Sequence, residues 1–207
     1  MNMKNIIKSA VLTVMFCLAF AVTVFAATET YTVRKGDSLW IIANKYQVGI
    51  SEIISANPQF RNPDLIYPGD KVIIPLMDAG TLSIEEEVIN LCNAERTRYG
   101  LQPLKINWEV SRVARYKSTD MRDGNYFSHM SPSYGSPFDM LQKFNISYKT
   151  AGENIAKGQK TAASVVNAWM NSEGHRANIL NSGFSEIGVG YVEGNGGPYW
   201  TQMFIKS

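Results

Sequence analysis

The chain has 207 residues, of which 45% are hydrophobic and 18% are charged, and its formal net charge is +2. This composition is typical of a globular protein and excludes an intrinsically disordered chain. The excess charge comes from Lys4 and Lys8, and the rest of the sequence is neutral, which argues against nucleic acid as the partner.

The first 26 residues are predicted to be a secretory signal peptide. Lys4 and Lys8 precede an uncharged run over residues 9–27, and the sequence VFA at 24–26 fits the small-residue cleavage pattern. An uncleaved anchor is the alternative, since the run is just long enough to span a bilayer. We expect export, cleavage, a mature chain that begins near Ala27, and no stable membrane anchor afterwards.

Residues 28–80 are predicted to fold as strand, helix, helix, strand. The ranges are a strand over 31–33, a helix over 39–46 capped by Asp37 or Ser38, a helix over 51–56 capped by Ser51, and a strand over 72–74 ended by Pro75. A module of this size is close to the lower limit for an independent core. Its polar loops are then free to bind a ligand.

The motifs YTVRKGDSLWIIANKY, SANP and LIYPGDKVIIP make residues 31–75 resemble a LysM module, for which we take residues 28–76 as bounds. The resemblance implies binding to N-acetylglucosamine-containing glycans, which are peptidoglycan or chitin-like, in a shallow groove between two loops. The implied lining residues are Gly36, Asp37, Ser38, Leu39, Leu65, Ile66 and Tyr67. Exposed backbone amides would bind the acetamido group, and apolar side chains would cover the sugar. Helix capping is the compatible alternative for Asp37 and Ser38.

Residues 77–83 lack apolar periodicity and are predicted to be a short linker that permits motion between two modules. A helix should follow, with Ser83 and Glu86 as a capping box and the acidic run at 85–87 solvated. Cys92 lies on the apolar face of this helix, so we expect a core residue and not a nucleophile. It is the only cysteine after the leader, which excludes an internal disulfide in the mature chain.

The rest of the chain is predicted to alternate helices with a small sheet. Helices are expected over 108–122, 138–144 and 162–170, and the first of them should carry Val110, Val113, Ala114, Lys117 and Met121 on one face. A short strand is expected over 153–156, and a hairpin should pair 187–192 with 199–205. Gly188 and Gly190 share one strand face, so a helix should lie against them. Burying both faces of the sheet favours a layered arrangement with helices on both sides.

Two histidines and two glutamates form the candidate site. His129 lies in YFSHMSP, Glu153 in AGENIA, and Glu173 and His175 in NSEGHRANIL. Glu173 is expected to project from the end of a buried helix face, and Gly174 to turn His175 back toward it. His129 and His175 could hold Zn²⁺ or another divalent cation, with the glutamates orienting them. The alternative is a hydrogen-bonded cluster that only rigidifies a cleft.

The motifs FSHMSP, GENIA, AWMNSEGHRANILN, IGVGYV and YWTQMF, in this order, resemble the CAP superfamily of cysteine-rich secretory, antigen 5 and pathogenesis-related (SCP-like) proteins, in its compact bacterial branch. The resemblance implies an α/β/α sandwich over residues 84–207 with His129, Glu153, Glu173 and His175 in a central cleft. The predicted fold class is therefore α+β, a βααβ LysM module followed by a CAP-type sandwich.

The functional prediction is a secreted, cell-wall-associated protein of Gram-positive origin, and a link to sporulation is part of this expectation. The LysM module would bind peptidoglycan, and the CAP domain would have a binding or structural role in the cell envelope or spore coat. The alternative is a metal-assisted hydrolase of cell-wall or peptide bonds, with Glu153 or Glu173 as base. The sequence contains no GxSxG or HExxH motif that would favour catalysis.

Overall fold

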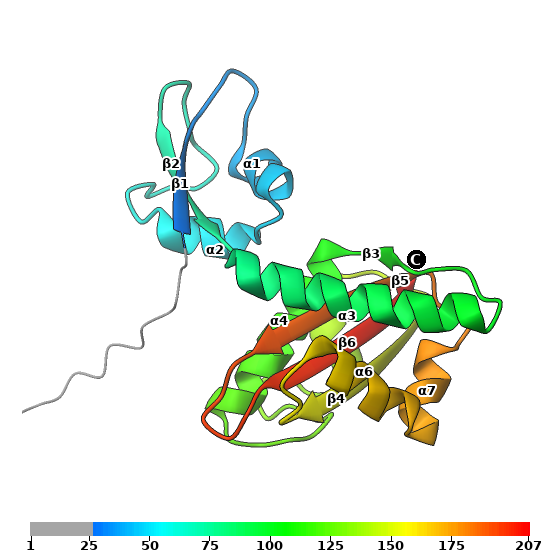
Figure 1. The fold of residues 1–207 in the computed structure, drawn as a ribbon. Helices are drawn as coiled ribbons and strands as arrows, with labels where there is room; N and C mark the ends of the chain where they lie inside the picture. Colours follow the sequence, from blue (N-terminus) through cyan, green and yellow to red (C-terminus); the bar gives the residue numbers. More distant parts are fainter. Residues whose placement is uncertain (1–26) are drawn as a thin grey trace, which may run out of the picture.

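The computed structural model describes residues 27–207, and the predicted signal peptide lies outside this range. Figure 1 shows a small module followed by a larger one, with a long helix leading from the first into the second. The small module contains β1 (Ala27–Thr32), α1 (Leu39–Tyr46), α2 (Ile50–Ala56) and β2 (Lys71–Leu76). The larger module contains α3 (Ala79–Arg98), β3 (Lys105–Ile106), α4 (Trp108–Asp123), α5 (Pro137–Lys143), β4 (Thr150–Lys157), α6 (Ala162–Met170), α7 (Glu173–Ile179), β5 (Glu186–Val192) and β6 (Tyr199–Lys206).

The small module has the predicted order of strand, helix, helix, strand, and its two strands pair antiparallel. Two local predictions are wrong. Gly49, and not Ser51, occupies the position before α2. β2 also continues through Pro75, which pairs with Thr28. A two-stranded sheet leaves one edge of each strand unpaired, so a residue without an N–H is tolerated there.

The predicted linker is largely helical. α3 begins at Ala79, where Asp78 is the N-cap and its Oδ2 accepts a hydrogen bond of 2.7 Å from the Thr81 backbone N–H. Ser83 and Glu86 therefore lie inside the helix and form no capping box. The Asp78 side chain satisfies a backbone N–H at the start of α3, and this cap stabilises a first turn that lacks an apolar pattern. Only Met77 and Asp78 separate β2 from α3.

The larger module is the expected sandwich. Its sheet has the order β3-β5-β6-β4, with β3 parallel to β5 and the other pairs antiparallel. Helices α4 and α5 pack on one face, and α3, α6 and α7 pack on the other (Figure 1). On β6, Trp200 and Phe204 face α3, α6 and α7, whereas Met203 and Ile205 face α4 and α5. This alternation follows from the two-residue period of a strand.

Gly188 and Gly190 let α4 approach the sheet, as predicted from their shared face. A Cβ at Gly188 would lie 2.2 Å from the Ser111 backbone nitrogen, and one at Gly190 would lie 2.1 Å from the Arg115 backbone nitrogen. No side chain fits at such distances. The backbone of α4 therefore rests directly on β5.

The acidic start of α3 is only partly solvated. Glu85 is 3% exposed, and its carboxylate accepts hydrogen bonds from the Arg115 side chain and the Tyr191 backbone N–H. Glu86 and Glu87 are exposed, as expected. The prediction for Glu85 was wrong because a charge pattern cannot show which side of a helix start meets another helix.

Across the described chain, no helix has both the length and the apolar character needed to cross a membrane.

Candidate functional site

His129 and Glu153 form a direct pair. Glu153 lies on β4 with its side chain 2% exposed, and its Oε1 is 2.6 Å from Nδ1 of His129, whose side chain is 52% exposed. With the carboxyl ionised and the imidazole in its neutral Nδ1–H form, Nδ1 donates this bond and Nε2 keeps a lone pair. Burial raises the pKa of Glu153, against the opposing influence of the His129 hydrogen bond and the charge of Lys117.

Lys117 supports the loop that carries His129. It lies on α4, is 1% exposed, and its Nζ donates a hydrogen bond of 2.9 Å to the His129 backbone carbonyl. Burial lowers its pKa, while Glu153 and Asp120 favour the charged form. The sequence placed Lys117 on the buried face of its helix but gave no sign of this role.

Asp120 anchors the same loop one turn later on α4. Its carboxylate accepts hydrogen bonds from Ser131 Oγ at 2.6 Å, Ser133 Oγ at 2.8 Å, and the hydroxyl of Tyr126. Burial opposes ionisation, but these donors and the Lys117 charge hold the pKa of Asp120 below its ordinary value. The Ser- and Pro-rich loop is therefore fixed to α4 at several points, which positions His129.

A buried chain of amides supports the other side of the site. Asn154 Nδ2 donates to Gln202 Oε1 at 3.0 Å and to the His175 carbonyl at 3.1 Å, and Asn178 Nδ2 donates to Asn154 Oδ1 at 2.9 Å. Gln202 Nε2 continues the chain to Cys92 Sγ at 2.9 Å. Sequence reasoning missed Asn154, Asn178 and Gln202, although each lies inside a quoted motif. A signal was available only for Gln202, which is an amide in the mostly apolar strand YWTQMF.

His175 is the third predicted residue near the pair. It lies on α7 and is partly buried. Burial lowers its pKa, and the nearby His129 lowers it further. The structure thus brings His129, Glu153 and His175 into one region, with the histidines on separate elements.

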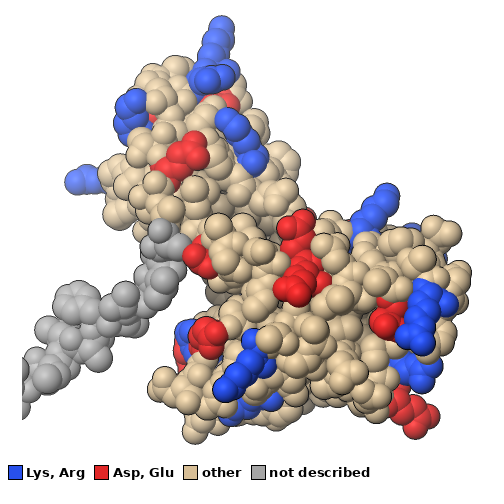
Figure 2. All heavy atoms as spheres, viewed as in Figure 1, with Lys and Arg blue, Asp and Glu red and all other residues tan. Residues whose placement is uncertain are grey.

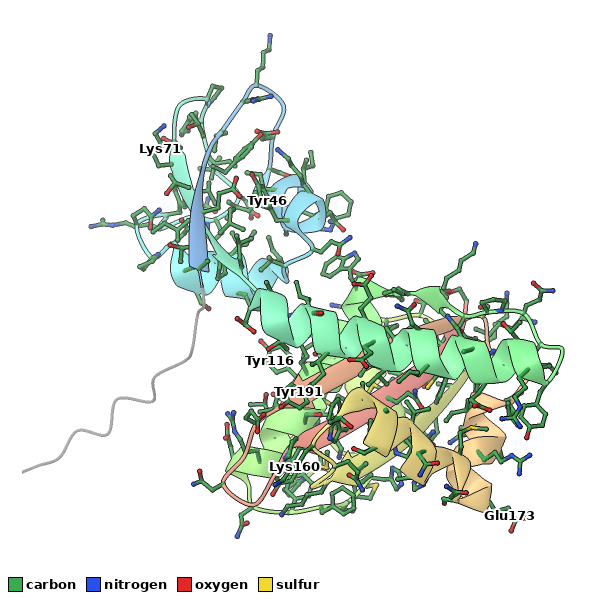
Figure 3. The ribbon with its side chains drawn as sticks, viewed as in Figure 1. Tyr46, Lys71, Tyr116, Lys160, Glu173 and Tyr191 are labelled. Atoms are coloured by element: carbon green, nitrogen blue, oxygen red, sulfur yellow. The ribbon has the colours of Figure 1, made fainter. Side chains whose placement is uncertain are left out.

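Glu173 is placed differently from the expectation. It is the first residue of α7, it is exposed, and Figure 3 shows its side chain at the end of that helix, pointing away from the sheet. Gly174 is inside α7 and makes no turn. The chain starts a new helix after Asn171 and Ser172, so the buried face of α6 does not continue to Glu173. Glu173 instead lines a surface hollow of about 480 Å³ together with residues of α6 and α7.

The donor set does not fit a metal site with three protein ligands. Within residues 27–207, no group of three or more His, Cys, Asp or Glu side chains is arranged to hold a metal ion. Nδ1 of His129 is engaged by Glu153. A catalytic zinc site needs three protein ligands and an open position.

The two predicted glycan-binding loops lie side by side. Val33 N–H donates to the Asp70 carbonyl, and Gly69 N–H donates to the Val33 carbonyl, both at 2.9 Å. These bonds join the loop after β1 to the loop before β2. Gly36 has a φ of +93°, which allows the tight turn at the start of the first loop.

The seven predicted lining residues divide into exposed and internal ones. Tyr67 is 64% exposed and Leu65 is 55% exposed, whereas Leu39 is 3% exposed and belongs to the core. Asp37 Oδ2 accepts hydrogen bonds from the Tyr31 hydroxyl and the Arg34 N–H, and Ser38 Oγ caps α1 at Ile41. The Leu39 side chain therefore cannot contact a sugar. Tyr67 and Leu65 supply the apolar surface.

Comparison with known proteins agrees with both resemblances. Residues 31–75 match the LysM domain, and residues 89–204 match CAP, the cysteine-rich secretory protein family. The uncharacterized protein YkwD of Bacillus subtilis is 65% identical over 121 residues, which cover 58% of this chain and 46% of that protein. The spore coat assembly protein ExsA of Bacillus cereus is 49% identical over 47 residues, which cover 23% of this chain and 7% of that protein.

The fold also matches a solved structure. An extracellular protein containing a SCP domain from Bacillus anthracis superposes with a TM-score of 0.59 at 34% identity, covering 68% of this chain and 47% of that one. This chain spans less than half the length of that protein and of YkwD. The chain belongs to the cysteine-rich secretory protein family and carries a LysM domain before its CAP domain.

Proposed function

We propose that this protein is exported to the cell wall, that its LysM domain binds N-acetylglucosamine in peptidoglycan, and that its CAP domain presents the His129–Glu153 site as a binding site. The observation that carries the LysM claim is the exposed pair Leu65 and Tyr67 on a loop bonded to the loop after β1. An aromatic and an aliphatic side chain can cover a sugar face while nearby backbone groups bind the acetamido group.

A location in the spore envelope is a further part of this proposal. It is supported by the similarity of the LysM region to ExsA, a spore coat assembly protein of Bacillus cereus. Fluorescent fusions imaged during growth and sporulation would test it. Signal confined to the vegetative wall would contradict the spore assignment and leave the glycan claim intact.

Co-sedimentation with insoluble peptidoglycan tests the glycan claim. The chain that begins at Ala27 should pellet with peptidoglycan, and the double variant Leu65→Ala/Tyr67→Ala should remain in the supernatant. Phe138→Ala is the matched control, because Phe138 is also an exposed aromatic residue but lies on α5. Equal recovery of the double variant in the pellet would contradict the assignment of this surface.

A second candidate is hydrolysis, and it rests on the geometry of the pair. A buried carboxylate holds Nδ1 of a half-exposed imidazole, which leaves Nε2 able to accept a proton from an attacking water. Release of soluble fragments from purified peptidoglycan by the unmodified chain, lost in His129→Ala, would favour this candidate. Absence of fragments from both would favour binding alone.

A further inference from the structure

The LysM and CAP domains touch through an ion pair at the start of α2. Arg112 on α4 donates to Glu52 with Nε to Oε1 at 2.6 Å and Nη2 to Oε2 at 2.8 Å. Nη2 also donates to Ser51 Oγ at 2.7 Å, and the Tyr116 hydroxyl donates to Glu52 Oε1 at 3.0 Å. Bidentate pairing of this kind fixes orientation as well as distance.

The ion pair is shielded from solvent. The Arg112 side chain is 19% exposed and that of Glu52 is 23% exposed. The guanidinium carbon lies 5.4 Å from the ring centre of Tyr116 and 5.0 Å from that of Phe144. Figure 3 shows Tyr116 in the CAP domain below the LysM domain. Burial opposes ionisation of Glu52, but the hydrogen bonds from Arg112 and Ser51 hold its pKa below the ordinary value.

Glycine at position 49 makes room for this contact. A Cβ there would lie 2.1 Å from both Arg112 Nε and Glu52 Oε2. Any side chain would displace the guanidinium or the carboxylate. The sequence at the start of α2 is thus matched to Arg112, although the two segments belong to different domains.

The backbone supplies a second connection. β2 ends at Leu76 and α3 begins at Ala79, so a hinge could use only Met77 and Asp78, and Asp78 is engaged as the helix cap. The β2–α3 connection and the Arg112–Glu52 ion pair together prevent the rotation of one domain against the other that a single connection would allow. Exposed ion pairs contribute little to stability, but this pair is half-enclosed and has four hydrogen bonds to hold it.

We propose that the LysM and CAP domains form one rigid unit in solution, with Arg112, Tyr116 and Phe144 as a docking surface for the start of α2. The docking does not depend on the proposed glycan binding. If the LysM domain does bind the wall, the docking holds the His129 site at a fixed distance and direction from the bound sugar. This contrasts with the independent motion that the sequence suggests.

Distance measurement between two spin labels tests the proposal. Labels at Lys35→Cys and Lys160→Cys, both exposed positions, report on the LysM and CAP domains (Figure 3 shows Lys160). Cys92 is buried and its raised pKa protects it from labelling. The doubly labelled chain that begins at Ala27, and so lacks Cys17, should give one narrow distance distribution, and Arg112→Ala should broaden it.

Two further variants make the result specific. Glu52→Gln changes the LysM side with almost no change in shape and should also broaden the distribution. Arg122→Ala removes an exposed ion pair with Asp123 on the same α4 helix and should leave it narrow. A broad distance distribution in the doubly labelled chain without further substitutions would overturn the proposal. An unchanged narrow distribution in both Arg112→Ala and Glu52→Gln would overturn it too.

Discussion

Glu153 Oε1 is 2.6 Å from His129 Nδ1, whereas Glu153 Oε2 is buried and has no hydrogen-bond partner among the described residues. Within residues 27–207, the Glu153 carboxylate therefore depends on His129 for its only direct hydrogen bond. This dependence links the stability of the sheet, which contains Glu153, to the loop that carries His129.

Removing the imidazole should therefore cost stability. We expect His129→Ala to lower the free energy of unfolding by about 1–3 kcal/mol, because both Glu153 oxygens would then be buried without a partner. Urea unfolding at neutral pH measures this. Phe127→Ala is the control, since Phe127 is 50% exposed in the same loop and should change stability by less than about 0.5 kcal/mol. Equal stability of both variants would contradict the dependence.

Acid should destabilise the protein through His175. Its folded pKa is lowered by burial and by His129 from an ordinary value of 6.5, so the unfolded chain binds more protons just below that value. The free energy of unfolding should therefore fall as the pH drops through 6.5 and level off below the folded pKa. The free energies of unfolding of the unmodified chain and of His175→Asn should converge as the pH falls from about 7.5 to about 5.5, because only the unmodified chain loses the contribution of His175. Parallel pH dependence in the two would refute this assignment.

The glycines of β5 provide a test of the fold. Gly188→Ala and Gly190→Ala should each lower stability by about 1–3 kcal/mol or prevent folding, because the added Cβ meets the α4 backbone. Gly174→Ala in α7 should instead raise stability by about 0.5–1 kcal/mol, since no described atom lies within 4 Å of its Cβ position. Thermal unfolding distinguishes the two outcomes. A tolerated alanine at both β5 positions would show that α4 packs farther away.

Sequence patterns predicted elements whose signals are local. The stripe Val110, Val113, Ala114, Lys117 and Met121 is buried as expected. The Gly188 and Gly190 face also predicted the packing of α4, because a strand places alternate residues on one side. Local patterns failed where the outcome depends on distant partners. Glu85, for example, pairs with Arg115 of α4, 30 residues away. The helical start of α3 was missed although its signal is local, because Asp78 caps the helix through Thr81.

The candidate site was predicted only in part for the same reason. Motif order identified His129, Glu153 and His175, which lie in one region, but the start of α7 at Glu173 placed that residue at the surface. The roles of Lys117 and Asn154 have no local signature, since they arise when α4 and β6 are brought next to β4. The contact between Arg112 and Glu52 joins two domains and is likewise invisible to periodicity.

Cys92 should report global unfolding. It is fully buried in the core, and burial raises its pKa to about 12. In the chain that begins at Ala27, a thiol reagent should react at the rate at which the core opens, and urea should accelerate the reaction in parallel with the unfolding transition. Rapid labelling under native conditions would contradict the buried position. Ser38→Cys, near the surface, is the control that should react at once.

Figure 2 shows basic and acidic side chains interspersed over the viewed face of both domains. A neutral glycan is compatible with such a surface, and recognition then rests on hydrogen bonds and apolar contact. Binding to the wall should consequently change little with ionic strength. Co-sedimentation with peptidoglycan at low and high salt measures this, and release by salt would indicate an electrostatic interaction with charged wall polymers.

Calorimetric titration with an N-acetylglucosamine oligomer tests the proposed glycan binding most directly. The chain that begins at Ala27 should bind, Leu65→Ala/Tyr67→Ala should lose about tenfold in affinity or more, equivalent to about 1.4 kcal/mol, and His129→Ala should bind as the unmodified chain does. No heat of binding from the folded chain, or unchanged affinity in the double variant, would contradict the account.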